Sequence, residues 1–330
     1  MTHLIYLEQS LQDHPEAKRI CQQFPKAPVI LCDHYGEIFN RRAQNFRQQK
    51  ANAALILAEK TGKRILPTPE SFGIGSMRNF YFSHMLNCIY DCRYCFLQGM
   101  YPSAHRVLFI NYHEFMDDID RTIATYKDDR CYFFSGYDGD SLALDPVSHF
   151  IQHFVPFFQA RPEAFLELRT KSANIRPLLN LPASDNIIVA FSLLPEKIAQ
   201  AVDHLTPAYE KRLQAIEAMA KKGFPIGLRF DPMIYCDDFE HIYPEMIHTL
   251  FKRINPKNVH SVSIGTLRFP NHTFKTIKKL YPSDQLLNHP LKKHKHMISY
   301  ASDLERALHQ SLKSTLGIYL PPESIFHCQS

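Results

Sequence analysis

The sequence contains no apolar run long enough to cross a bilayer. The longest run, Ala53 to Ala58, is far short of the roughly 20 residues that a spanning helix needs. No secretory leader is recognisable at the amino end, and eight cysteines in 330 residues are sparse for a disulfide-stapled fold. We therefore expect a cytoplasmic protein with reduced thiols and no membrane partner.

The sequence also lacks a strong charge imbalance. Lysine and arginine total 38 and aspartate and glutamate total 33, which gives a net charge of +5 beside 18 histidines. This mildly basic character is compatible with a polyanionic partner but does not require one. Hydrophobic residues make up 45% of the chain, which suffices for one large domain with smaller appendages.

Three cysteines lie within eight residues, at Cys88, Cys92 and Cys95. A C-x3-C-x2-C run without a fourth partner at short range offers three thiolates to an iron-sulfur cluster and leaves one iron without a protein ligand. A cluster used only for electron transfer is normally closed by a fourth thiolate, so the open iron indicates that a small molecule binds there. The spacing, with Tyr94 just before the third cysteine, resembles that of the radical S-adenosylmethionine (AdoMet) superfamily.

The same cysteines are compatible with two plainer roles. A structural zinc site needs four ligands, and the fourth would have to come from far away in the sequence, for example from His84 or Cys131. The cysteines are also compatible with unliganded thiols in a core. In these cases the chain would be a non-catalytic protein that binds zinc or a structural cluster for folding or partner contact.

Residues 1–75 are expected to form a small α+β appendage. Between Asn40 and Asn52 the sequence is dominated by arginine, lysine, glutamine and asparagine, which favours a solvated helix or loop over an arm that contacts phosphate. The other elements expected here are strands at Leu4 to Leu7 and Pro28 to Cys32, a helix at His14 to Phe24, and a hairpin from Ala54 to Glu59 and Arg64 to Leu66.

Residues 76–270 show strands alternating with helices, which predicts parallel strands joined by helical crossovers. Six βα units are too few for a full eight-fold barrel and predict a partial (β/α)6 TIM-like barrel. We expect residues 271–330 to form a helical extension. The expected strands are Tyr81 to Leu86, Cys131 to Phe134, Phe165 to Leu168, Ile187 to Phe191, Ile226 to Phe230 and Val259 to Ile264. The expected helices are Tyr112 to Tyr126, Asp145 to Phe158, Ile175 to Leu179, Ala208 to Lys222 and Asp238 to Ile254.

Polar residues follow these strands, at the carboxyl edge where parallel α/β folds bind ligands. Gly136 lets the backbone approach the methionine end of AdoMet, and Lys171 can neutralise its carboxylate. Asp140 or Ser141 can meet its ammonium or ribose, but both are equally suited to capping a helix or turn. Ser192 could also be satisfied by local backbone.

Within the radical AdoMet superfamily, the chain resembles spore photoproduct lyase and its DNA-repair-photolyase-like relatives. The resemblance implies that Cys88, Cys92 and Cys95 hold a [4Fe-4S] cluster, that Lys171 and Ser192 contact AdoMet, and that Tyr94 takes part in catalysis. It also implies a partial (β/α)6 barrel. The resemblance rests on Leu4 to Glu8, Cys88 to Gln98, Leu168 to Lys171, Phe191 and Ser192, Gly223 to Gly227, Asp231 to Tyr235, and Arg268 and Phe269.

The chain departs from this family pattern at two positions. Spore photoproduct lyase carries a cysteine after the second strand that returns a hydrogen atom to the product, helped by tyrosines around the third cluster cysteine. Here Ser135 stands near that place, and Phe96 replaces one of the tyrosines. The O–H bond of serine is too strong to replace a thiol. The resemblance therefore implies AdoMet cleavage, whereas thymine-dimer repair does not follow from it.

We expect a radical AdoMet enzyme that receives electrons from a donor such as flavodoxin or ferredoxin. Nucleic acid is the first substrate to consider, by analogy and from the mild positive charge. A small molecule or a peptide is the alternative. Basic residues that would follow phosphates are Arg41, Arg42, Lys275, Lys278 and Lys279.

Overall fold

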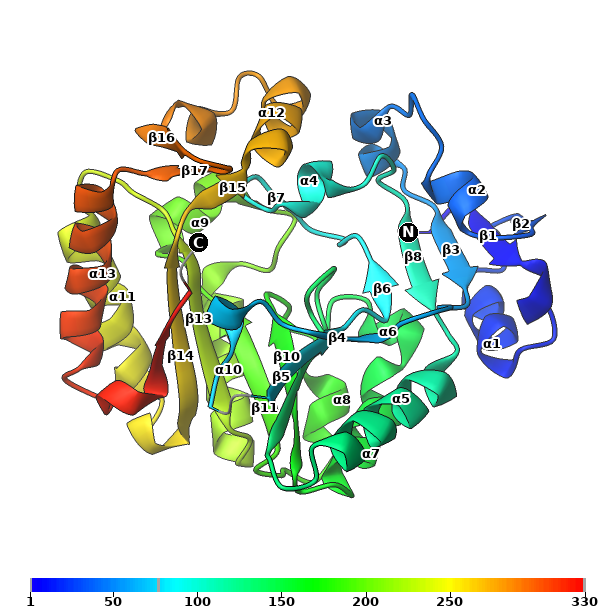
Figure 1. Cartoon of the computed structure of the whole chain (residues 1–330), viewed down its shortest axis with the longest axis horizontal. Coiled ribbons are helices and arrows are strands. Elements are labelled where there is room, and N and C mark those ends of the chain that lie inside the picture. The colour runs from blue at the N-terminus through cyan, green and yellow to red at the C-terminus, as the bar shows by residue number, and fades with distance from the viewer. Residues whose placement is uncertain (1, 76–77, 329–330) are drawn as a thin grey trace.

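The computed structural model describes residues 2–75 and 78–328. Its largest element is a curled sheet with the strand order β18-β14-β13-β11-β10-β9-β5-β4 (Figure 1). Six of these strands are mutually parallel and follow one another in chain order, which confirms the expected partial (β/α)6 barrel. They are β5 (Arg78–Phe82), β9 (Cys131–Phe134), β10 (Ala164–Thr170), β11 (Ile187–Ser192), β13 (Ile226–Met233) and β14 (Val259–Thr266).

The central strands are almost continuously apolar because both faces of the sheet are covered. Every residue of β11 is buried, from Ile187 to Ser192, as expected for a parallel strand between outer helices and a filled interior. The edges differ: β4 (Ile65–Pro67) pairs antiparallel with β5, and β18 (Ile325–His327) pairs parallel with β14.

Helices cover the outer face of the barrel (Figure 1). In the first of them, Tyr112, Phe115, Ile119 and Ile123 are buried, and their spacing of three to four residues forms a single apolar face. The barrel helices are α5 (Tyr112–Thr125), α6 (Asp145–Ser148), α7 (Phe150–Gln159), α8 (Arg176–Leu179), α9 (Glu196–Val202), α10 (Tyr209–Lys222), α11 (Phe239–Arg253) and α13 (Ser302–Leu316).

The expected single helix from Asp145 to Phe158 is two helices. His149 interrupts it with a left-handed φ of 54°. The Asp145 carboxylate then accepts a hydrogen bond from the backbone N–H of Ile151 (2.8 Å), in the first turn of α7. The apolar pattern continues across this break, which is why periodicity alone predicts one uninterrupted helix.

A second sheet lies beside the barrel and has the order β2-β1-β3-β8-β6. The expected hairpin is wrong, because β3 pairs with β1 and β8 while β4 belongs to the barrel sheet. The expected strand Tyr81 to Leu86 is divided between β5 and β6, which lie in different sheets. The elements here are β1 (Ile5–Glu8), α1 (Pro15–Gln23), β2 (Val29–Cys32), α2 (Gly36–Phe39), α3 (Phe46–Ala51), β3 (Leu55–Ala58), β6 (Met85–Leu86) and β8 (Arg106–Phe109).

Strand pairing crosses both expected boundaries between the three parts of the chain. Strands β6 and β8, which follow residue 75, complete the N-terminal sheet, and residues 76–77 at that boundary lie outside the described ranges. The last 60 residues contain strands as well as helices, and β18 extends the barrel sheet. The division at residues 75 and 270 stays a prediction.

Several short elements gather above the carboxyl ends of the barrel strands. Helices α12 and α3 stand on opposite sides of α4 and β7 (Figure 1). These elements are β7 (Asp91–Cys92), α4 (Leu97–Met100), β12 (Asp203–His204), β15 (Arg268–Pro270), α12 (Asn271–Leu280), β16 (Leu291–His294) and β17 (Met297–Tyr300). Short 3₁₀ helices are Gln9–Leu11, Glu70–Phe72, Pro256–Asn258, Gln285–Asn288 and Pro322–Ser324. In the described part of the chain, no helix combines the length and apolar character required to traverse a bilayer.

Candidate active site

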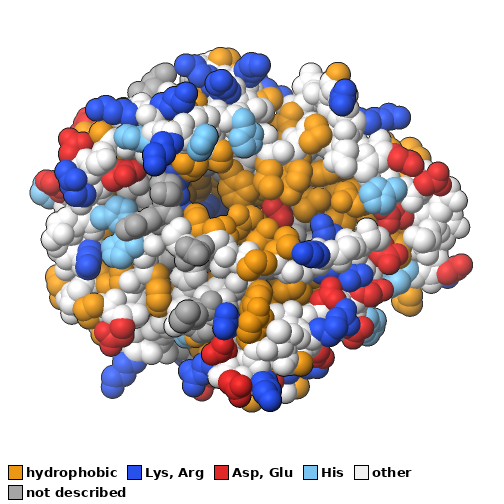
Figure 2. All heavy atoms as spheres, viewed as in Figure 1, with side chains coloured by type: hydrophobic (Ala, Val, Ile, Leu, Met, Phe, Trp, Pro, Cys, Tyr) orange, Lys and Arg blue, Asp and Glu red, His pale blue; other side chains and the backbone are white. Residues whose placement is uncertain are grey.

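A cavity of about 500 Å³ lies at the carboxyl ends of the barrel strands. It occupies the face on which Figure 2 shows an apolar hollow, with lysines and arginines along its upper rim. Cys88, Cys92 and Cys95 all line it. The structure thus brings together expected site residues that are up to 104 positions apart in sequence, from Cys88 to Ser192. The other expected site residues that line the cavity are Tyr94, Gly136, Asp140, Lys171 and Ser192.

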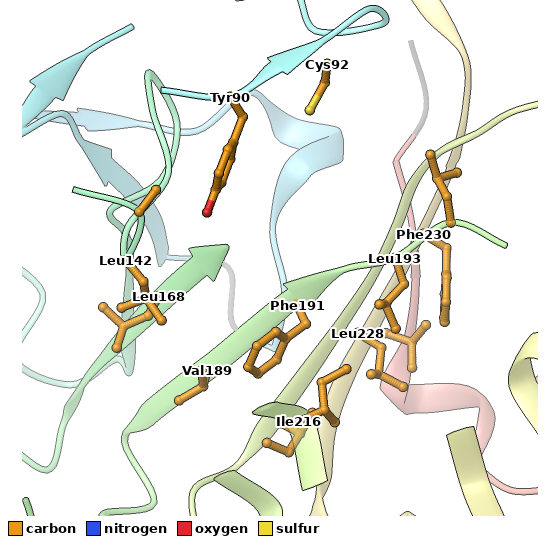
Figure 3. Packing of buried hydrophobic residues seen from close by; sticks show 14 of the residues in the cluster. Tyr90, Cys92, Leu142, Leu168, Val189, Phe191, Leu193, Ile216, Leu228 and Phe230 are labelled. Atoms are coloured by element: carbon orange, nitrogen blue, oxygen red, sulfur yellow. The ribbon is translucent and has the colours of Figure 1, made fainter. Parts of the chain in front are cut away.

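A fixed turn leads into the cysteine segment. Asn87 has a φ of 66°, a left-handed conformation that asparagine tolerates better than most residues. Its side-chain amide donates hydrogen bonds to the carbonyls of Ser103 (2.8 Å) and His105 (2.7 Å). Further along, Cys92 lies in β7, where it pairs with Asp203 of β12. Figure 3 shows the side chains of Tyr90 and Cys92 reaching from this segment toward the barrel strands.

Lys50 holds the cysteine segment from one side. Its ammonium group donates hydrogen bonds to the backbone carbonyls of Cys88 (3.0 Å) and Tyr90 (2.7 Å), and its side chain lines the cavity. Lys50 belongs to α3, in the polar stretch for which the sequence predicts a solvated helix or loop. The helix is present, but this lysine is half-buried at the site.

The segment after β7 is held from the opposite side by residues of the C-terminal part. The side-chain amide of Gln98 donates through its Nε2 to the Asp91 carboxylate (2.8 Å), and its Oε1 accepts a hydrogen bond from the Tyr281 hydroxyl (3.0 Å). Arg93 forms ion pairs with Asp91 (2.6 Å) and Asp284 (3.1 Å). The cysteine segment is therefore anchored both to α3 and to the region around α12.

Tyr94 is part of a buried polar network. Its hydroxyl donates to Asp203, which also accepts a hydrogen bond from Arg212 at 2.9 Å. Burial alone would raise the pKa of Asp203, but Lys171 and Arg212 outweigh burial and lower it below the usual value. The Lys171 ammonium lies 5.3 Å from the centre of the Tyr94 ring. Lys171 thus lies at the cavity wall beside this network.

Asp140 joins the loops that follow β9 and β10. One carboxylate oxygen accepts from the N–H groups of Leu142 (3.0 Å) and Ala143 (2.9 Å) and from the Thr170 hydroxyl (2.6 Å). The other accepts from the N–H of Lys171 (2.7 Å). Burial raises the pKa of Asp140, and these four hydrogen bonds oppose the rise. Asp140 thus caps the turn that contains Leu142 and Ala143, as one of its two expected roles, whereas its contact with AdoMet stays a prediction.

Ser141 lies behind the cavity wall rather than in it. It is 1% exposed, and its hydroxyl shares a 2.8 Å hydrogen bond with that of Ser135. The neighbouring Gly136 is required by space, since a Cβ there would lie 2.9 Å from the Arg169 carbonyl oxygen and 2.9 Å from the Ser141 hydroxyl. Ser192 lines the cavity and its backbone carbonyl accepts from Arg212.

The three thiols suit an iron-sulfur cluster. Burial raises the pKa of Cys88 to about 12 and also raises the pKa of Cys92 and Cys95. Iron ligation requires the thiolate, so binding a cationic cluster would displace these protons. None of the three forms a disulfide. At Cys95, the positive charges of Lys50 and Lys171 oppose the pKa rise.

A single zinc ion suits the site less well. Within residues 2–75 and 78–328, no three His, Cys, Asp or Glu side chains are grouped closely enough to hold one metal ion. His84 is stacked on Phe150 with ring centres 4.0 Å apart, and burial lowers its pKa to about 3. Cys131 is a buried thiol at the start of β9, with a weak contact to the Asp129 carbonyl. The four sulfurs or nitrogens of a structural zinc site are thus not assembled.

The barrel interior below the cavity holds a buried ion-pair network. Glu167 accepts hydrogen bonds from Arg229 (2.7 and 3.2 Å) and from Arg169 (2.9 Å), and Arg229 also donates to the Ser261 carbonyl (3.0 Å). Burial opposes ionisation, but the two arginines outweigh it and lower the pKa of Glu167 to about 2. The network links β10, β13 and β14 beneath the site.

Sequence reasoning missed two residues that shape the site, Lys50 and Asp203. Lys50 and Asp203 act through partners distant in sequence, and no local pattern marks them. Arg268 pairs with Asp231 (2.9 Å) at the cavity wall. Asp231 lies near the carboxyl end of β13 and Arg268 just beyond β14, in segments on which the family resemblance rests. Tyr137, in the loop after β9, also lines the cavity.

Comparison with known proteins identifies the family. The family profile described as spore photoproduct lyase matches residues 1–325. The chain belongs to the spore photoproduct lyase family. Curated relatives include the spore photoproduct lyases of Bacillus subtilis, 21% identical over 98% of this chain and 96% of the relative, and of a Geobacillus species, 22% identical over 72% and 73%. Members of this family are radical AdoMet enzymes.

Solved structures of spore photoproduct lyase share the fold. A double mutant with bound AdoMet and dinucleoside spore photoproduct matches with a TM-score of 0.86 at 16% identity, over 100% of this chain and 98% of the other. A complex with dinucleoside spore photoproduct alone matches with a TM-score of 0.83 at the same identity and coverage. At this identity the structural likeness supports the fold.

Proposed function

We propose that this radical AdoMet enzyme cleaves AdoMet at a [4Fe-4S] cluster and abstracts a hydrogen atom from a nucleic-acid lesion. The observation that carries the proposal is the presence of Cys88, Cys92 and Cys95 on one cavity, each free to ligate a different iron. When bound, a cluster with an open iron supplies the electron that converts AdoMet to methionine and a 5'-deoxyadenosyl radical.

Residues around the cysteines would hold AdoMet. The Lys171 cation is available to the AdoMet carboxylate, since its ammonium makes no ion pair with the described side chains and lies over the Tyr94 ring. Gly136 permits close backbone approach, and Ser192 and Asp140 present polar atoms from neighbouring strand ends. Tyr94 is expected to shape this pocket through its bond to Asp203.

A nucleic-acid substrate is favoured by the basic rim of the cavity, by which we mean the exposed lysines of α12 and the β16–β17 hairpin. Its lysines form no ion pair within the described residues, so their charges are uncompensated. Figure 2 shows lysines and arginines above the hollow, on the side where Figure 1 places α12 and this hairpin. Two of the solved structures named above hold a dinucleoside lesion, which makes that compound the first probe. The lysines are Lys275, Lys278, Lys279, Lys292, Lys293 and Lys295.

A cytoplasmic location and a flavodoxin- or ferredoxin-type electron donor belong to the same proposal. Low-potential chemistry at a cluster with an open iron requires a reducing compartment and a one-electron partner. The eight unpaired cysteines are compatible with that compartment.

Anaerobic reconstitution tests the proposal. We expect a brown protein that forms 5'-deoxyadenosine from AdoMet under reduction and repairs dinucleoside spore photoproduct. Cys92→Ala should abolish 5'-deoxyadenosine, whereas Cys131→Ala, which removes a buried thiol outside the cavity, should leave it. A colourless protein with stoichiometric zinc would contradict the proposal, and AdoMet cleavage stimulated only by a peptide or metabolite would overturn the substrate assignment.

A further inference from the structure

Tyr137 places a phenol at the cavity wall. It lies in the loop after β9, lines the same cavity as the three cysteines and is partly exposed. Its ring stacks on that of Tyr81, with ring centres 4.2 Å apart and ring planes at 23° to each other. The centre of the Phe96 ring lies 6.0 Å from that of Tyr137. Burial is the main cause that raises its pKa, so the hydroxyl keeps its proton. Among the described residues the hydroxyl has no hydrogen-bond partner.

The other two tyrosines of the cavity are already engaged. The Tyr94 hydroxyl donates to Asp203 inside the network with Arg212, and Tyr94 is 8% exposed. The Tyr90 hydroxyl interacts with Ser172. Tyr137 is therefore the cavity tyrosine whose O–H is free to meet a substrate.

Radical chemistry at this site requires a hydrogen donor. After 5'-deoxyadenosyl takes a hydrogen atom from the substrate, the rearranged carbon radical must regain one. The thiols on the cavity are the three expected cluster ligands. Ser135 has a strong O–H bond that donates to the Glu167 backbone carbonyl, and its oxygen shares a further hydrogen bond with the Ser141 hydroxyl. A phenol O–H is much weaker, because the resulting radical is delocalised over the ring.

We propose that Tyr137 is the catalytic residue that returns a hydrogen atom to the product radical. This inference rests on the proposed function above. In the step, the Tyr137 O–H bond breaks homolytically, a C–H bond forms on the product, and Tyr137 becomes a neutral phenoxyl radical. One electron from the same class of one-electron donor that reduces the cluster, with one proton from solvent, restores the phenol.

The stacked ring of Tyr81 supports this role. Tyr81 lies at the end of β5, is partly exposed and has its ring nearly parallel to that of Tyr137. A neighbouring π system stacked in this geometry stabilises an electron-deficient ring. Over each turnover, AdoMet and two electrons with one proton yield methionine and 5'-deoxyadenosine, while the substrate is rearranged without net oxidation.

The test uses a single turnover of the reconstituted enzyme in D2O with dinucleoside spore photoproduct. The phenol proton exchanges with solvent, whereas carbon-bound hydrogens do not, so wild-type product should carry deuterium at the repaired carbon and 5'-deoxyadenosine should carry none. Tyr137→Phe, which keeps the stacked ring, should still form 5'-deoxyadenosine but lose the deuterium in the product. Tyr81→Phe, which keeps both the ring and Tyr137, should retain it.

A spectroscopic readout separates this role from a structural one. With a single electron equivalent per chain, the phenoxyl radical cannot be restored, so wild-type enzyme should show a tyrosyl signal by electron paramagnetic resonance and Tyr137→Phe should not. Wild-type deuterium in the product of Tyr137→Phe overturns the inference. Failure of the wild-type enzyme to form 5'-deoxyadenosine, or to form product from the lesion, instead overturns the proposed function on which it rests.

Discussion

At the residue scale, Lys50 shows how a side chain remote in sequence can define a reactive centre. Its partners are the carbonyls of Cys88 and Tyr90, 38 and 40 residues further along the chain. The cysteine spacing predicts that Cys88, Cys92 and Cys95 act as one ligand set. Ligands to one cluster must lie close together in space, and these three also lie close together in sequence. A lysine that bonds to backbone carbonyls leaves no such pattern, so its role appears only once α3 is placed beside the cysteine segment.

We predict that Lys50→Met weakens the cluster site. Loss of a charged donor from two carbonyls should destabilise the cysteine segment by about 1.5–3 kcal/mol, which lowers the iron and sulfide content per chain after reconstitution. Loss of a cation near the cluster should also make its reduction potential more negative, because a positive charge stabilises the added electron.

Lys63→Met is the matched control, since Lys63 is exposed in the loop between β3 and β4. Lys63→Met should change neither the iron and sulfide content per chain nor the reduction potential of the cluster. Iron content and reduction potential that are the same in Lys50→Met and wild type would show that Lys50 contributes only to the surface of α3.

At the scale of elements, local pattern located most barrel strands but not all of their partners. The six expected strands overlap β5, β9, β10, β11, β13 and β14, since buried parallel strands are recognisable as short apolar runs. Ala54 to Leu66 looked like a hairpin because two apolar runs flank a glycine turn. Which sheet each run joins depends on contacts distant in sequence, and here β3 and β4 joined different sheets.

The ion pairs between β10 and β13 should make the stability of the barrel depend on pH. The pKa of Glu167 falls from its ordinary value of 4.5 to about 2. A depressed carboxylate pKa stabilises the folded state above the unfolded pKa, and this stability is lost as the pH falls from about 4.5 toward 2. Glu167→Gln should cost about 3–5 kcal/mol at pH 7, because it leaves the buried Arg229 without its ion-pair partner.

Urea unfolding of wild type and Glu167→Gln at a series of pH values measures this effect. The difference in unfolding free energy between them should shrink as the pH falls below about 4.5. Glu163→Gln, at an exposed position just before β10, should match wild type throughout. A difference that stays constant with pH would mean that Glu167 does not ionise in the folded barrel.

At the scale of the whole molecule, part of the positive charge lies beside the cavity, although lysines and arginines also occur elsewhere on the surface (Figure 2). The sequence predicted only a mildly basic protein, because a net charge of +5 averages over all faces. Folding brings α12 and the β16–β17 hairpin together above the barrel strands (Figure 1), and their exposed lysines form no ion pair among the described residues. The position of these lysines in the fold, and not the net charge of the chain, therefore makes the protein a candidate nucleic-acid binder.

We predict that replacing Lys278, Lys292 and Lys293 by glutamine weakens binding of single-stranded DNA. Each lysine that no longer neutralises a phosphate should reduce the magnitude of the negative slope of log affinity against log salt by about 0.7. Fluorescence anisotropy over a range of salt concentrations measures this slope. Replacing Lys221 and Lys222, which are exposed at the end of α10, should leave it unchanged. Affinity that is insensitive to salt in the wild type would exclude a phosphate-binding role for the rim.

The anchoring of the cysteine segment from both sides sets the order in which the protein can mature. Lys50 reaches it from the first sixth of the chain, whereas Tyr281 and Asp284 reach it through Gln98 and Arg93 after more than four-fifths has been synthesised. A nascent chain that is still on the ribosome before Tyr281 emerges presents three thiols on a segment secured only on one flank. Both flanks of the cysteine segment can therefore be secured only after Tyr281 and Asp284 have been synthesised.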